Sequence, residues 1–275
     1  MTGIPGERMI GGRLQQNQWL GPESFHEVTP MKPGIPDYGL DAPNLVRLFL
    51  IGGFLLLAVG LALVLLSTDW LTTVGSIAFT FGLIFTIEGL LMIWSSRYGK
   101  LRARDRLLDE VGLSGQENLL DVGCGRGLLL IGAARRLPHG RAVGVDLWSQ
   151  VDLSHNSASA TLANAAAEGV AERVEVHEAD MRKLPFADAS FDAVVASLSI
   201  HNIYSVEGRS EAIREIARVL KPDGKVVLMD IRHVREYAKG LRAAGMQDVR
   251  VSGLSFWIFP PVRTVMARKE RVEAA

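Results

Sequence analysis

The stretch that decides the fold reads Glu117-Asn118-Leu119-Leu120-Asp121-Val122-Gly123-Cys124-Gly125-Arg126-Gly127-Leu128-Leu129-Leu130. Residues 117–122 have the apolar character of a buried strand, and residues 128–136 have that of a helix. The three glycines between them permit a sharp turn in which the backbone comes close to a ligand. The stretch therefore predicts a strand, a glycine turn and a helix, an arrangement that nicotinamide and flavin sites also use.

Strand and helix patterns alternate along the chain on both sides of this turn. A short helix is expected at 101–111, and the later helices are expected at 157–168, 211–219 and 233–244. Further strands are expected at 141–146, 174–178, 191–197 and 225–230, with a terminal strand pair at 249–254 and 261–268. Strands alternating with helices indicate an α/β fold with a parallel, doubly wound sheet.

Two long apolar runs precede this domain. Residues 48–66 carry no charge, and residues 71–94 carry only Glu88. The first run measures roughly 28 Å as a helix, close to the thickness of a bilayer core. A secretory signal is disfavoured, because about forty mostly polar residues come first and no cleavage site follows. We predict a transmembrane hairpin with spans at 48–66 and 71–94. The alternative is a buried hairpin in a soluble core.

The distribution of basic residues predicts the orientation of the hairpin. Residues 67–70 between the runs contain no lysine or arginine, whereas both flanks contain several. The positive-inside rule then places both termini in the cytoplasm, and a bacterial inner membrane is the expected location. The expected domains are a cytoplasmic segment at 1–44, the hairpin at 45–96 and a catalytic domain at 97–275.

Small residues recur every seventh position in both runs. They are Gly53, Gly60 and Ser67 in the first run and Gly75, Gly82 and Gly89 in the second. Such a seam lets two helix backbones approach closely, within one chain or in a homodimer. Glycine is also simply common in membrane helices. Glu88 is either a functional carboxyl or a neutralised group near the cytoplasmic edge.

Composition excludes several other classes of protein. Thirty basic and thirty acidic residues give a formal net charge of +0, so no global field attracts nucleic acid. The single cysteine, Cys124, excludes an intramolecular disulfide. No cluster has the spacing of zinc ligands, and no metal is expected.

Two acidic residues make the glycine turn more informative. Asp146 ends the expected second strand about twenty residues after the turn, where a carboxylate suits a ribose diol. Asp180 follows the third strand, where a carboxylate can accept a hydrogen bond from an exocyclic amine.

With these motifs, residues 101–269 resemble the class I S-adenosylmethionine-dependent methyltransferases, most closely the small-molecule branch that includes the ubiquinone/menaquinone C-methyltransferases. The resemblance implies a Rossmann-like, seven-stranded sheet with S-adenosylmethionine as cofactor and S-adenosylhomocysteine as product. The residues that carry it are Asp121-Val122-Gly123-Cys124-Gly125-Arg126-Gly127, Gly144-Val145-Asp146, Ala179-Asp180-Met181, Leu184-Pro185-Phe186, Phe191-Asp192-Ala193-Val194 and Leu220-Lys221-Pro222-Asp223-Gly224-Lys225.

The resemblance implies which residues would hold the methionine part of the cofactor. Gly123 and Gly125 would let it lie over the turn, with Asp121 near its amino group. Ser197, at the end of the fourth strand, would approach the same part. Cys124 lies within this cofactor loop, and its thiol is expected to be a small buried filler.

The resemblance also implies an adenosine side. Asp146 would hold the ribose hydroxyls, and Leu147 or Trp148 would cover one face of the adenine ring. Asp180 and the backbone of Met181 would contact the polar edge of that ring. His155 and Asn156 are further candidates for the ribose side.

The segment after the fourth strand is expected to meet the methyl acceptor. Amine methyltransferases that act on nucleic acid typically have an Asn/Asp-Pro-Pro-aromatic signature here, and its absence disfavours a nucleic acid substrate. His201, at the carboxyl end of this strand, is the candidate base or hydrogen-bond partner. Asn202 and Tyr204 are candidates for the same pocket. The alternative is that His201 only orders the loop.

The sequence departs from the ubiquinone type at one place. Those enzymes usually insert a cap after the fifth strand, whereas here the next helix follows almost directly. We expect the N-terminal forty residues to form a lid. The cytoplasmic end of the hairpin, a second protomer in a homodimer and the bilayer surface are the other candidates. The aromatic segment 254–261 either lines the pocket, lies at the membrane interface or packs on the sheet edge.

The hypothesis is a membrane-anchored methyltransferase for a small lipophilic acceptor, such as a quinone or other isoprenoid, a sterol-like molecule or a lipid, with membrane lipid as a partner. The alternatives are a membrane-tethered protein methyltransferase and a non-catalytic S-adenosylmethionine-binding assembly or sensor protein.

Overall fold

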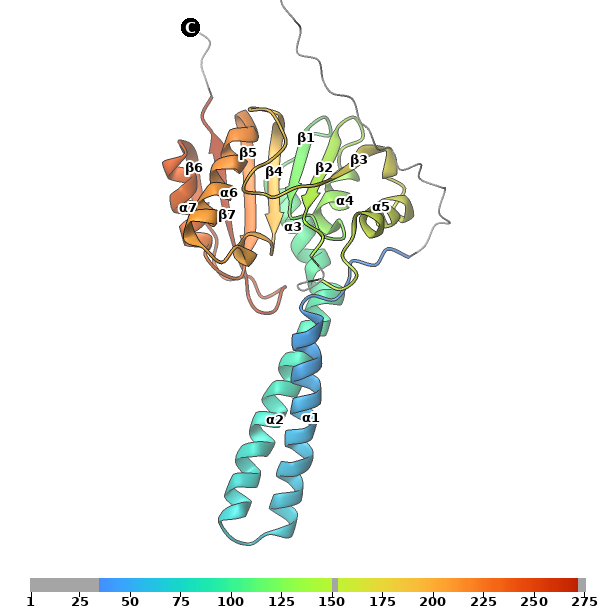
Figure 1. Cartoon of the computed structure of the whole chain (residues 1–275), viewed down its shortest axis with the longest axis vertical. Coiled ribbons are helices and arrows are strands. Elements are labelled where there is room, and N and C mark those ends of the chain that lie inside the picture. The colour runs from blue at the N-terminus through green and yellow to red at the C-terminus, as the bar shows by residue number, and fades with distance from the viewer. Residues whose placement is uncertain (1–34, 150–152, 272–275) are drawn as a thin grey trace, which may run out of the picture. The chain divides into compact units, whose positions relative to one another are not determined.

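A computed structural model describes residues 35–149 and 153–271, and Figure 1 shows their arrangement. The sheet has seven strands in the order β3-β2-β1-β4-β5-β7-β6. The strands are β1 Asn118–Val122, β2 Arg141–Asp146, β3 Val174–Glu178, β4 Phe191–Ser197, β5 Leu220–Asp230, β6 Met246–Val251 and β7 Arg263–Lys269. β1 to β5 pair in parallel, whereas β7 is antiparallel to β5 and β6. The predicted α/β fold is confirmed.

The sheet has two apolar faces because successive strand residues point to opposite sides. Leu120 belongs to one buried cluster with Ile213 and Ile216 of α6. Its neighbour Leu119 belongs to the other, with residues of α3 and α4. Each buried leucine or isoleucine contributes about 1.5–3 kcal/mol. The helices are α3 Lys100–Val111, α4 Leu128–Ala134, α5 Ala158–Ala167, α6 Val206–Val219 and α7 Val234–Ala243.

The strand order determines where a ligand can bind. From β1 the chain runs outward to β2 and β3, and then returns to β4 on the other side of β1. In open α/β sheets, ligands bind beyond the carboxyl ends of the strands at this reversal. The glycine turn after β1 and the segment after β4 meet at that point.

Some element boundaries differ from the sequence prediction. α6 begins at Val206, five residues early, because Ser205 caps it by accepting a hydrogen bond from the N–H of Gly208. β6 begins at Met246 and β7 at Arg263, so the predicted terminal strands are shifted. The aromatic segment 254–261 consequently lies in the β6–β7 loop.

Two apolar helices precede the sheet domain, α1 Pro43–Leu66 and α2 Trp70–Trp94. α2 continues through the π-helical turn Ser95–Gly99 into α3. Both helices are long and apolar enough to cross a membrane. Only 11% of the most apolar window of α1 is buried, which disfavours the alternative of a soluble core hairpin. Large apolar side chains, such as Phe54 and Leu55, are more than half exposed.

The predicted glycine seam is confirmed where α1 and α2 pack together. A Cβ added at Gly60 would lie 2.7 Å from the carbonyl oxygen of Gly75, and one at Gly82 would lie 2.8 Å from that of Gly53. These distances leave no space for a side chain, so the helices touch backbone to backbone. The seam joins two helices of one chain, and it is therefore not a free surface for a second protomer.

Candidate active site

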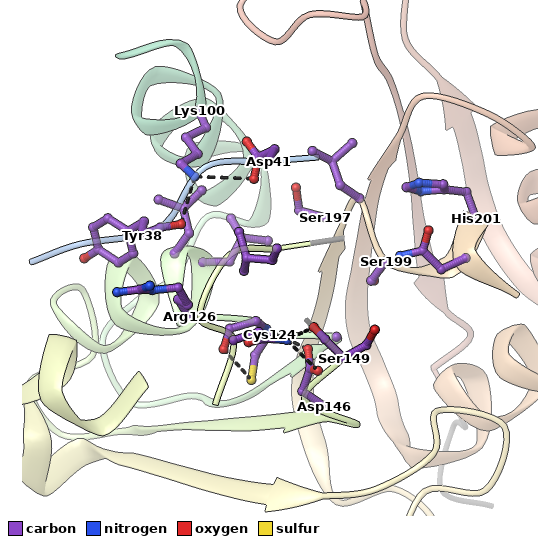
Figure 2. Close-up of a pocket in the computed structure, with 18 of the residues that line it drawn as sticks. Tyr38, Asp41, Lys100, Cys124, Arg126, Asp146, Ser149, Ser197, Ser199 and His201 are labelled. Atoms are coloured by element: carbon purple, nitrogen blue, oxygen red, sulfur yellow. Dashed lines mark hydrogen bonds and ion pairs between the residues drawn. The ribbon is translucent and has the colours of Figure 1, made fainter. Parts of the chain in front are cut away.

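A cavity of about 310 Å³ lies at the carboxyl ends of β1, β2 and β4. Its walls come from the glycine turn, the segment after β4, residues 38–42, the end of α2 and the β6–β7 loop. Figure 2 shows lining residues from several of these segments around the cavity. The cavity therefore joins segments far apart in the sequence.

Positive backbone angles let the glycine turn form the cavity floor. Gly123 has φ +74, and a Cβ on it would lie 2.2 Å from Cβ of Ser199. Gly125 and Gly127 also have φ values that disfavour other residues. The side chain of Cys124 packs against Gly144. Burial, together with the carboxylates of Asp121 and Asp146, raises the pKa of the Cys124 thiol, which fits a small buried filler.

Asp121 is buried at the cavity floor, where its Oδ2 accepts a hydrogen bond from the N–H of Leu130 at 2.9 Å. Burial is the main reason that its pKa rises to about 8, and the nearby charge of Asp146 adds to the rise. A cation placed beside this carboxyl would favour its ionised form. Asp121 therefore suits the ammonium group of a ligand.

Asp146 is held at the rim of the cavity by three donors. It accepts hydrogen bonds from the N–H of Gly125 at 2.8 Å, the N–H of Trp148 at 2.7 Å and the side-chain amide of Asn156 at 3.2 Å. Asn156 is buried and lines the cavity, and its Oδ1 has no hydrogen-bond partner within the described part of the chain. A hydroxyl-bearing ligand would satisfy this acceptor, so the site fits the ribose of S-adenosylmethionine.

The remaining residues predicted for the cofactor divide into two groups. Leu147, Met181 and Ser197 line the cavity. Trp148, which packs against a core cluster, and the exposed His155 are not among the lining residues. The carboxylate of Asp180 is also outside the lining, and the guanidinium of Arg182 binds both its oxygens and lowers its pKa.

On the acceptor side, His201 lines the cavity from the short helical turn Ile200–Asn202. Its Nδ1 lies 2.6 Å from Oδ1 of the buried Asp230. Asp230 also accepts hydrogen bonds from the N–H of His201, the N–H of Ile231 and the hydroxyl of Tyr237. Burial and the charge of Asp230 raise the pKa of Tyr237, so the phenol stays protonated as a donor.

Asn202 lines the cavity, as expected, but Tyr204 does not. The Tyr204 side chain is 98% exposed. The guanidinium of Arg209 holds the carbonyls of Ile203 and Tyr204, which fixes the backbone with this side chain on the surface. Tyr204 is therefore no longer a candidate for the acceptor pocket.

The expected absence of a cap after β5 is confirmed, because α7 begins at Val234, shortly after β5 ends at Asp230. The end of α2 contributes Met92 to the cavity, and the β6–β7 loop contributes Ile258, Phe259 and Pro260. The lid expected from residues 1–40 lies mostly outside the described residues.

Residues 35–42, the described connector before α1, are held beside the glycine turn. Nζ of the buried Lys100 donates to the carbonyl oxygens of Tyr38 at 2.9 Å and Gly39 at 2.7 Å, and it lies 3.4 Å from Oδ1 of Asp41. Figure 2 shows Lys100 reaching this connector. Arg126 pairs with Asp37 at 3.0 Å. Sequence reasoning missed these contacts, because they join residues far apart in the chain.

Comparison with known proteins decides the family of this domain. Residues 120–228, from β1 into β5, match the family described as "Methyltransferase domain". The sheet domain is a class I S-adenosylmethionine-dependent methyltransferase domain. Its family thus agrees with the resemblance seen in the sequence.

Curated relatives share this methyltransferase domain. An uncharacterized protein of Haemophilus influenzae is 35% identical over 49% of this chain and 51% of its own length. The ubiquinone/menaquinone biosynthesis C-methyltransferase UbiE of Geotalea daltonii is 31% identical over 41% and 44%, respectively. The sterol 4-C-methyltransferase strm-1 of Caenorhabditis elegans is 30% identical over 48% and 36%. The chain thus spans about half or less of the length of these relatives.

Solved structures share the fold of the methyltransferase domain. The YcgJ protein of Bacillus subtilis has a TM-score of 0.50 and 17% identity, covering 62% of this chain and 99% of that one. The [4+2]-cyclase SpnF has a TM-score of 0.50 and 22% identity, covering 62% and 82%. Because one of these proteins is a cyclase by name, the fold alone does not assign the reaction.

Proposed function

We propose that the protein is a membrane-anchored S-adenosylmethionine-dependent methyltransferase that acts on a small lipophilic acceptor. One observation carries the proposal: a single cavity is lined both by the glycine turn and by Met92, near the end of the apolar helix α2. An acceptor dissolved in the bilayer would reach such a cavity along the hairpin. Relatives named for quinone and sterol methylation support this class of acceptor.

The cofactor would supply a methyl group on a positively charged sulfur. Asp121 would hold its ammonium group, because a buried carboxyl with a raised pKa gains most from a neighbouring cation. Asp146 and Asn156 would hold the ribose hydroxyls through the carboxylate and the unsatisfied amide oxygen. The glycine floor leaves room for the methionine part between these two ends.

His201 and Asp230 would serve an acceptor that must lose a proton. Asp230 lies beside Nδ1 of His201 and would favour the tautomer with the proton on that nitrogen, which leaves Nε2 as the ring nitrogen that would take the acceptor's proton. Asp230 would also stabilise the imidazolium that forms. The backbone N–H of His201 and the phenol of Tyr237 bind the same carboxylate, so the carboxylate is fixed beside the ring. Asn202 would offer a further hydrogen bond to the acceptor.

The hairpin would anchor the protein, with both termini in the cytoplasm of a bacterium and the hairpin in its inner membrane. The proposed domains are a cytoplasmic segment at 1–44, the hairpin at 45–96 and the catalytic domain at 97–275. Membrane location matters chemically, because tethering raises the effective concentration of enzyme where the acceptor partitions. The cavity walls favour a small acceptor over a protein side chain, since they include the apolar Met92, Ile258 and Phe259.

The test uses full-length protein in lipid vesicles with methyl-labelled S-adenosylmethionine and a total lipid extract. We expect label in the organic phase, with an His201→Asn variant that binds S-adenosylhomocysteine but transfers little label. Label in protein would instead support the protein methyltransferase, and cofactor binding without transfer would support the non-catalytic alternative. Either result would contradict the proposal.

A further inference from the structure

The β6–β7 loop docks on the helix that leaves the hairpin. The ring of Trp257 stacks on Trp94 at 6.3 Å between centroids, and the guanidinium groups of Arg102 and Arg106 lie 5.1 Å and 5.0 Å from the centre of the Trp257 ring. These three partners belong to one continuous helix, Trp70–Val111. Trp257 is therefore held between an aromatic ring at the end of α2 and two cations on α3.

Two further contacts join the loop backbone to this helix. A Cβ added at Gly99 would lie only 1.7 Å from the carbonyl oxygen of Trp257, so the loop backbone rests directly on the glycine. The N–H of Phe259 donates to Oγ of Ser95 at 2.9 Å. Both contacts fall in the π-helical turn Ser95–Gly99, next to the end of the apolar hairpin.

The outer side of this loop combines exposed apolar groups with unpaired cations. Phe256 is 69% exposed and Leu254 is 52% exposed, and Tyr98 on the helix is 66% exposed. Arg102 and Arg106 are exposed, and among the described residues neither forms an ion pair. A cation–π contact with Trp257 uses the charge of each guanidinium without using its N–H groups, which can bind an anion.

We propose that this surface, formed by Trp94, Tyr98, Arg102, Arg106, Leu254, Phe256 and Trp257, binds the headgroups of anionic phospholipids. The inference rests on the proposed function, because it requires the hairpin to span a membrane. Trp94 ends α2, so the headgroup region of a spanned bilayer passes beside it. Arg102 and Arg106 bind lipid phosphates there, while Phe256 enters the acyl boundary.

This lipid contact has a consequence for the cavity. Ile258, Phe259 and Pro260 of the same loop line the cavity together with Met92. When the outer side of the loop lies in the headgroup region, its inner side, which lines the cavity, lies next to the bilayer. The surface therefore positions the mouth of the cavity where a lipophilic acceptor arrives.

The test is made on the full chain, reconstituted in vesicles of phosphatidylcholine alone or mixed with phosphatidylglycerol. A fluorescent label is attached in a Phe256→Cys variant and quenched by a lipid with a nitroxide near the headgroup. A Gln116→Cys variant is the matched control, because Gln116 is exposed at the opposite, amino end of β1. The unsubstituted protein reports any labelling of the buried Cys124.

We expect quenching at position 256 and none at 116, with stronger quenching when phosphatidylglycerol is present. The double variant Arg102→Gln, Arg106→Gln removes the increase in quenching that phosphatidylglycerol causes. Each arginine contributes about fivefold to the affinity of this surface for anionic lipid. The variant Arg214→Gln, which removes an exposed arginine of α6, leaves the increase in quenching unchanged. Quenching at 256 no stronger than at 116 overturns the inference.

Insertion of the hairpin is measured in the same vesicles by protease protection. If the hairpin is inserted but position 256 is unquenched, the lipid surface is wrong and the proposed anchoring stands. If the hairpin is not inserted, both are wrong. If position 256 is unquenched in vesicles but shielded in native membranes, a protein covers the surface, which also overturns the inference.

Discussion

Replacing Gly123 with alanine tests the glycine floor of the cavity. At φ +74 an alanine costs about 1–2 kcal/mol of backbone strain. The new Cβ would also lie 2.2 Å from Cβ of Ser199, so Ser199 must move. That movement breaks the 2.8 Å hydrogen bond from its hydroxyl to the carbonyl of Val122, worth about 1 kcal/mol. Together these effects lower the free energy of unfolding by about 2–3 kcal/mol.

The matched control is Gly169→Ala. Gly169 has a similar φ of +69, but a Cβ there meets nothing within 4 Å. The Gly169→Ala variant should lower the free energy of unfolding only by the backbone strain, about 1–2 kcal/mol, and leave ligand binding unchanged. Denaturant unfolding gives the stability of each variant, and calorimetric titration with S-adenosylhomocysteine gives the affinity. Gly123→Ala should weaken binding at least tenfold, because the moved backbone fills the cavity floor.

A double variant separates the clash from the strain. Gly123→Ala combined with Ser199→Gly removes the facing Cβ, so part of the binding should return. If Gly123→Ala is no more destabilised than Gly169→Ala and binds the product normally, the close approach of the two backbones is not what forms the site.

Three further predictions concern other parts of the molecule. Asp230→Asn should lower kcat about 10²–10⁴-fold while the affinity for S-adenosylhomocysteine is kept, as measured by steady-state kinetics and titration. Asp121→Asn should abolish cofactor binding. In the wild type, the raised pKa of Asp121 lowers the free energy of unfolding by about 1–4 kcal/mol as pH rises from about 4 to 8. The Asp121→Asn variant should lack this dependence on pH. Lys100→Met should release the connector, seen as faster proteolysis between residues 35 and 42, because three contacts to residues 38–41 are lost. Each result is checked on purified full-length protein.

These predictions have their own controls. For Asp230, a kcat loss that is the same at every pH, with weaker binding of the product, would indicate only a structural role. For Asp121, an unfolding curve with the wild-type pH dependence would contradict a protonated carboxyl in the ligand-free protein. For Lys100, unchanged proteolysis would show that the other contacts, such as the Arg126–Asp37 pair and the hydrogen bonds between Asn164 and Asp37, are enough to hold the connector.

Local sequence patterns were sufficient to predict the parallel strands and the glycine turn. The strand before Gly123, the turn and the helix after it are contiguous, so spacing alone places them. Asp146 could also be placed, because it ends a strand adjacent to β1. The glycine seam was predictable for the same reason: a seven-residue repeat places all its members on one helix face.

Contacts between distant segments could not be predicted in this way. Asp230 meets His201 only because β4 and β5 are neighbours in the sheet, and Lys100 meets the connector across the whole hairpin. Tyr204 was expected in the pocket, but binding of its carbonyl by Arg209 places its side chain at the surface. Such side-chain directions depend on tertiary partners that a single strand or loop does not reveal.

The central claim is that this cavity holds S-adenosylmethionine across Asp121 and Asp146. Calorimetric titration of the full chain with S-adenosylhomocysteine, for the wild type and for Asp146→Ala, tests it most directly. We predict one site per chain in the wild type and an affinity roughly 10–100-fold weaker in Asp146→Ala, the loss expected for hydrogen bonds to a charged group. Absence of binding to the wild type, or equal affinity of the two proteins, would contradict the claim.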